Sequence, residues 1–282
     1  MSRRDLRLLL LGVAAALLLG SGVFILLASL QGPKQQDAAQ IEPSVVAPEA
    51  GAPAPAGAPA EILAARAVIE KKIGETPDVA RFFDRLRLAL PAEYESIIAT
   101  LARRRMGGGG DTPDYYLSEA VKILRQSRGA LAARADAPAL AKVFAQQLAV
   151  LNALSTRDPH LCVDFLYGGA SEAFFDFSAD NRALVADLAI AGLDAIVDGK
   201  QKNIARAAPN EADFKQFEAA LQQAGLAPLE IDALLDGKTP DPPLPDARMC
   251  AAGQIYLQTL AALPDPARLR IYALAIDLMA RS

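Results

Sequence analysis

An uninterrupted apolar run near the N-terminus constrains this chain most. Residues 8–30 are 23 consecutive positions without a charged residue or a proline. At about 1.5 Å of rise per residue such a helix is roughly 35 Å long, enough to cross a hydrocarbon core of about 30 Å. A cleaved signal peptide is the alternative, but its apolar core is normally roughly 7–15 residues long and ends at a small-x-small site. The sequence therefore predicts an uncleaved transmembrane helix over residues 8–30.

Charges on the two sides of this run predict its orientation. Residues 1–7 include Arg3, Arg4 and Arg7, whereas the residues after the run are net negative. Because basic flanking residues stay in the cytoplasm, we expect residues 1–7 to be cytoplasmic. The expected protein is a single-pass protein of the inner (cytoplasmic) membrane, with its main domain on the outer side, in a bacterial periplasm.

Small residues recur at every fourth position of the predicted membrane helix. Gly12, Ala16 and Gly20 would form a ridge of the kind that lets two membrane helices approach closely. The alternative is that Gly and Ala are simply frequent in such helices. A homodimer through this ridge is therefore one prediction, and attachment to the membrane through residues 8–30 is another.

The next thirty residues have a composition that cannot build a core. Residues 31–60 contain six Pro, nine Ala and three Gly, with few large apolar side chains. The alternation of Ala and Pro over residues 52–60 favours polyproline II, which makes a semi-rigid spacer. At about 3.1 Å per residue, this tether could hold the following domain up to roughly 90 Å from the membrane.

Apolar residues recur at helical spacing through most of residues 61–282, and strand-like alternation is rare. The sequence therefore predicts an all-α extracytoplasmic domain of about nine helices. A segment that we expect to begin at an N-cap, Ser178, is apolar on most sides and should be the central helix. The last two predicted helices, 246–263 and 266–280, should form an antiparallel pair. The sequence does not show whether the domain divides near Gly199 or near the proline-rich loop over residues 237–245.

Composition excludes several classes of function. The domain has one histidine, His160, so zinc sites that need two imidazoles are excluded, and we expect no metal and no cofactor. The formal net charge of −4 lacks the basic footprint of a protein that binds nucleic acid. No signature of nucleophilic catalysis is present, so the sequence favours a role without catalysis.

The two cysteines give the most specific structural prediction in the sequence. Cys162 and Cys250 lie in the part of the chain that we expect outside the cytoplasm, where cysteine pairs are usually oxidised. There is no CxxC motif, and the neighbouring Asp158 and Asp164 would raise the pKa of a thiol at position 162 rather than lower it. We therefore predict a structural disulfide, with two free buried thiols as the alternative.

One short segment has an unusual composition. It holds five of the sixteen aromatic residues within thirteen positions, interleaved with acidic residues around a Gly-Gly pair. One interpretation is a groove for a ligand or partner, and the other is that the aromatic residues belong to the core while the acids are solvated. The predicted binding segment consists of Phe165, Tyr167, Glu172, Phe174, Phe175, Asp176 and Phe177.

These features lead to two hypotheses about function from different classes. The first is a membrane-anchored interaction or scaffold module that binds an envelope protein through helix faces or through the aromatic segment. The second is an envelope enzyme that hydrolyses glycan or peptide with carboxylates alone, for which Glu172 and Asp176 are the candidates. A sensor or an immunity-type factor that binds one exported protein is a variant of the first hypothesis.

Overall fold

The computed structural model describes residues 58–169, 171–236 and 240–281. Within this part of the chain every regular element is a helix, so the all-α prediction is confirmed, although twelve α-helices and one 3-10 helix (η1) replace the nine expected. The elements are α2 (Ala58–Gly74), α3 (Pro77–Ala89), α4 (Pro91–Met106), α5 (Pro113–Arg128), η1 (Gly129–Arg134), α6 (Ala137–Arg157), α7 (Pro159–Leu166), α8 (Glu172–Asp180), α9 (Arg182–Lys202), α10 (Glu211–Gln223), α11 (Pro228–Asp236), α12 (Asp246–Ala262) and α13 (Asp265–Arg281).

The predicted membrane helix, its ridge of small residues and most of the tether lie outside the described residues. Among the helices that are described, none is both long and apolar enough to cross a bilayer. α2 begins at Ala58, so the last three residues of the predicted tether, 58–60, are helical. Alanine is the best helix former, and Pro59 is tolerated because it lies in the first turn.

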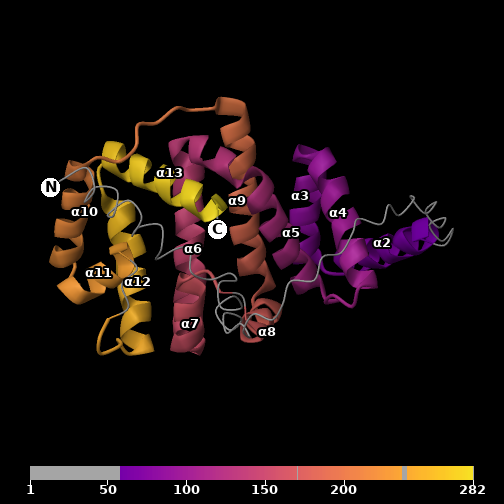
Figure 1. Cartoon of the computed structure of the whole chain (residues 1–282), viewed down its shortest axis with the longest axis horizontal. Coiled ribbons are helices and arrows are strands. Elements are labelled where there is room, and N and C mark those ends of the chain that lie inside the picture. The colour runs from indigo at the N-terminus through magenta and orange to yellow at the C-terminus, as the bar shows by residue number, and fades with distance from the viewer. Residues whose placement is uncertain (1–57, 170, 237–239, 282) are drawn as a thin grey trace, which may run out of the picture.

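The helices form an elongated body (Figure 1). α2 extends from one end of the long axis, next to α3 and α4, and α10, α11 and α12 lie at the other end. α6 and α9 run side by side through the middle. The buried apolar side chains of the described residues form one continuous cluster.

α9 is the central helix, as its sequence predicts. It packs against η1, α3, α5, α6 and α8. Many of its buried side chains are small, and at Gly199 an added Cβ would lie 1.9 Å from the carbonyl oxygen of Leu131 in η1. A side chain at position 199 is therefore incompatible with this packing. Gly199 marks a close contact between helices, not a linker between domains.

Capping residues set several of the helix starts. The side chains of Thr112, Asp136 and Asn210 each accept a hydrogen bond from a backbone N–H of the following first turn. Asn210 and Asp213 form a reciprocal capping box. Thr76 also precedes a helix, but its hydroxyl instead donates to the carbonyl oxygen of Lys72 at 3.1 Å.

The two C-terminal helices exist as expected, but they do not pack along each other as an antiparallel pair. α13 turns away from α12 and packs mainly against η1, with further contacts to α5 and α6 (Figure 1). The apolar face of α13 packs against α6 through an aromatic pair, in which Tyr272 stacks on Phe144 with ring centroids 4.0 Å apart.

The predicted disulfide is confirmed. Cys162 in α7 and Cys250 in α12 are fully buried and bonded to each other, with Cα atoms 5.7 Å apart. The bond joins two helices that are 88 positions apart in sequence. It therefore fixes the C-terminal part of the domain to its middle.

Removing the disulfide should lower the free energy of unfolding without changing the fold. Because the bond closes a long loop in the unfolded chain, replacing both cysteines with alanine should cost roughly 4–5 kcal/mol. Urea unfolding followed by circular dichroism measures the change. An equally stable double variant would show that the bond does not restrict the unfolded chain as we expect.

Three buried carboxylates each pair with an arginine from another helix. Asp114 of α5 accepts from Arg182, Asp213 of α10 from Arg270 of α13, and Glu230 of α11 from Arg248 of α12. The hydrogen bond from Arg270 lowers the pKa of Asp213 below its ordinary value. Burial raises the pKa of Glu230, but the hydrogen bonds from Arg248 and the backbone N–H of Ala227 outweigh it, so the net shift is downward.

Breaking the pair between Asp213 and Arg270 should destabilise the domain in a pH-dependent way. Arg270→Met leaves a buried carboxylate without its main partner and should cost about 2–3 kcal/mol at neutral pH. Since the folded-state pKa of Asp213 is lowered, the stabilisation is present above about pH 4 and is lost as the pH falls below it. The free energy of unfolding, measured in urea, should therefore differ less between the original protein and Arg270→Met in acid than at neutral pH.

Arg281→Met is the matched control for this experiment. Arg281 lies on the same helix, but its ion pair with Asp277 is within one helical turn and the arginine side chain is 71% exposed. Exposed pairs of this kind contribute little to stability. Equal losses for the two variants would contradict the assignment of the first pair as an interhelical contact.

Candidate functional site

The predicted binding segment folds into two short helices joined by a glycine turn. α7 begins after Asp158, whose side chain accepts from the backbone N–H of His160 at 2.8 Å. The turn after α7 needs a positive φ of 82° at Gly168, and the N–H of Gly169 donates to the carbonyl oxygen of Asp164 at 2.7 Å. This φ explains Gly168, because residues with a Cβ rarely adopt it. At Gly169 an added Cβ would lie 3.0 Å from the carbonyl oxygen of Asp164, so a side chain there would be crowded.

The aromatic side chains of the segment mostly point into the domain. Phe165 of α7 stacks on Phe174 of α8 with centroids 5.7 Å apart, and Phe174 in turn lies 5.9 Å from Phe177. Phe174 and Phe177 are buried, while Phe165, Tyr167 and Phe175 are half-buried. Burial also raises the pKa of the Tyr167 hydroxyl. The stack therefore joins α7 to α8 and forms part of the core.

The two candidate carboxylates lie on the opposite side of α8. Glu172 and Asp176 are both exposed. Two surface hollows of the domain lie elsewhere: one of about 450 Å³ between α5, η1 and α13, and one of about 340 Å³ between α2, α3 and α4. Neither includes residues of α7 or α8. A hydrolytic role of Glu172 and Asp176 stays a prediction.

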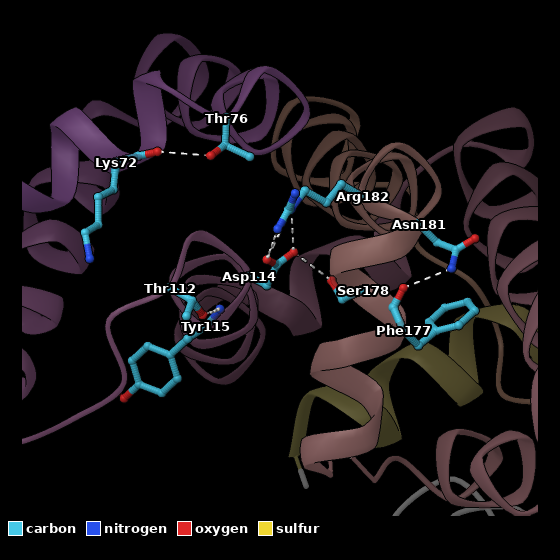
Figure 2. A network of polar contacts seen from close by, with 9 residues as sticks. All are labelled: Lys72, Thr76, Thr112, Asp114, Tyr115, Phe177, Ser178, Asn181 and Arg182. Atoms are coloured by element: carbon cyan, nitrogen blue, oxygen red, sulfur yellow. Dashed lines mark hydrogen bonds and ion pairs between the residues drawn. The ribbon is translucent and has the colours of Figure 1, made fainter.

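A buried polar network anchors α8 to its neighbours (Figure 2). Ser178 donates to Asp114 at 3.2 Å, and Arg182 donates to both oxygens of the same carboxylate. Figure 2 shows Asp114 between these two residues, and the amide of Asn181 donating to the carbonyl oxygen of Phe177 at 2.9 Å. The prediction that Ser178 caps the central helix is therefore wrong.

The physical reason is that the chain interrupts its helix between α8 and α9. α8 ends at Asp180, Asn181 is the N-cap position of α9, and Ser178 lies inside α8. The predicted start at Ser178 therefore lies within the last turn of α8, and the central helix begins after Asn181. The buried hydroxyl of Ser178 binds Asp114, a residue 64 positions away, which local sequence does not reveal.

His160 is an exposed residue at the junction of α7 and α12. Its Nδ1 lies 2.8 Å from a carboxylate oxygen of Asp246, and its Nε2 lies 3.9 Å from Asp164. The hydrogen bond with Asp246, followed by the charges of the nearby carboxylates, raises the pKa of the imidazole. No group of three potential ligands able to hold a metal ion occurs among the described residues.

The structure reveals one surface that the sequence analysis did not assign. α2 buries one face through Ala65, Ile69 and Ile73. Its opposite face is also apolar and is exposed; Leu63 is 66% and Val68 37% accessible to solvent. The signal in the sequence is a second apolar stripe on this helix, opposite the stripe that faces the core. We call this surface the α2 face, and it consists of Ala60, Leu63, Ala64, Ala67 and Val68.

Comparison of the sequence with protein-family models, with curated proteins and with solved structures gives no match. The function must therefore be inferred from the residues and their arrangement.

Substitutions in α8 should separate its buried side from its exposed side. Phe177 is 1% exposed, so Phe177→Ala should lower the free energy of unfolding by about 3–5 kcal/mol. Asp176→Asn, one position earlier, should stay within about 0.5 kcal/mol of the original protein because the carboxylate is solvated. Urea unfolding of both variants makes the comparison. A large loss for Asp176→Asn would assign that residue a structural role.

Proposed function

We propose that this chain is an envelope interaction or scaffold module, anchored in the inner membrane by residues 8–30 and held away from it by the tether. The α2 face is the observation that carries the proposal. Scattered exposed leucines are normal on proteins, whereas a continuous apolar face on one helix marks an interaction surface. The binding partner is an envelope protein that contacts this face.

The rest of the surface supports this choice by contrast. The other large apolar side chains that are exposed in the described residues are Leu88, Met106 and Leu229, which lie on three different helices. Many of the charged residues between helices are already engaged within the domain; Arg81 pairs with Asp187 and Arg85 with Asp194. The α2 face instead combines several exposed apolar residues over about two turns.

A charged substitution in the α2 face should prevent partner binding without unfolding the domain. Leu63→Lys in the full-length protein should reduce the captured partner about tenfold, which corresponds to about 1.4 kcal/mol. The measurement is chemical crosslinking in intact membranes, followed by affinity capture and quantitative mass spectrometry. Circular dichroism should be unchanged because Leu63 is mostly exposed.

Leu229→Lys is the matched control, because it places the same charge at another exposed leucine, on α11. This variant should capture the same amount of partner as the original chain. Equal capture by all three proteins would contradict binding through the α2 face. A partner lost equally in both variants would point to a general effect of the added charge.

A further inference from the structure

We propose that the α2 face binds the same face of a second copy of this chain, with the two helices parallel. This inference rests on the proposed function, because it assigns the partner of the surface proposed there. Two features support it: the order of large and small residues on the face, and the end at which the preceding chain enters α2. The small extent of the face determines where the pairing can occur.

The α2 face is self-complementary in a parallel pair. Successive residues of a helix are rotated by about 100°, which places the alanines near the middle of the face, with Leu63 on one side and Val68 on the other. When two such helices are related by a two-fold axis parallel to them, Leu63 of one lies beside Ala64 of the other. Val68 likewise lies beside Ala67. Each large side chain thus meets a small one, which allows close packing.

The path of the chain selects the parallel arrangement. The 57 residues that precede α2 join its N-terminal end. In Figure 1 α2 extends from one end of the elongated body, with its N-terminal end, in the darkest indigo, outermost. In the proposed function the residues that precede α2 come from the membrane. Two copies anchored in one membrane therefore deliver α2 with the same polarity, and a parallel pair keeps both tethers at one end. An antiparallel pair would send the two tethers in opposite directions.

The small size of the face predicts when pairing occurs. Lys71 lies one turn beyond Ala67, is 75% exposed on its side chain, and would meet its own counterpart in a parallel pair. This like-charge contact limits the pairing to the first turns of α2. The area that these turns can bury is well below the roughly 800 Å² per partner of a stable interface. The contact should therefore form in the membrane, where anchoring raises the effective concentration of the two copies.

Disulfide crosslinking of the full-length protein in its membrane tests this arrangement. Ala60→Cys and Ala67→Cys are introduced separately, and covalent dimers are quantified after oxidation on non-reducing gels. The two positions are about 10 Å apart along the helix, so both link to their own counterparts only when the helices are parallel and in register. Each variant should give at least about ten times more dimer than Ala173→Cys, an exposed alanine on α8, because only the α2 positions are held together.

Leu63→Glu added to each cysteine variant should remove the crosslink, because it places like charges between the helices. If only one of the two positions links to itself, the helices are antiparallel and the parallel arrangement is wrong. If position 67 links to a different protein, identified by mass spectrometry of the joined peptides, the second copy is wrong while the proposed function stands. If neither position links to any protein above the Ala173→Cys level, both proposals are overturned.

Discussion

The close approach of α9 to its neighbours sets the positions of most other helices. Alanines at 186, 189, 191 and 195 line its buried surface, and Gly199 lets the backbone of η1 pass at a distance that no side chain would permit. Small side chains bring helix axes close together, so η1, α6 and α3 can all pack on one helix. α8 and α5 also contact α9, and through them the aromatic segment is connected to the core.

Buried charge adds directional contacts to this apolar packing. A carboxylate that is removed from water must be paired, and an arginine on another helix can satisfy it in one geometry. The pairs of Asp114, Asp213 and Glu230 therefore specify how distant segments meet, which apolar contacts alone do only loosely. These three buried carboxylates are paired inside the domain, whereas the α2 face is an apolar surface that no described helix covers.

Local sequence predicts those parts of this fold that depend on local chemistry. Helical periodicity predicts the all-α class, and the caps at Thr112, Asp136 and Asn210 mark helix starts because the capping group and the N–H lie within three residues of each other. The break between α8 and α9 and the docking of α13 depend on contacts between residues that are far apart in sequence, so periodicity could not show them.

The same distinction applies to the candidate site. Aromatic composition indicated an unusual segment, but whether Phe174 faces the core or a partner depends on the position of α7 and α9. The exposed face of α2 was visible in the sequence as apolar residues on both sides of one helix. Ile69 and Ile73 form the stripe that faces the core. The apolar residues opposite them could be assigned to the surface only from the structure, in which no described element covers them.

The disulfide also has a consequence for biogenesis. A chain with two cysteines has one possible intramolecular pairing, so oxidation cannot trap it in a scrambled isomer, and maturation needs an oxidant but no isomerase. The wrong product that remains is a bond between two chains. This bond between chains can form most easily after Cys162 has been synthesised and before Cys250, 88 positions later, has paired with it. Folding of α7 into the core before that point would bury the first thiol and protect it.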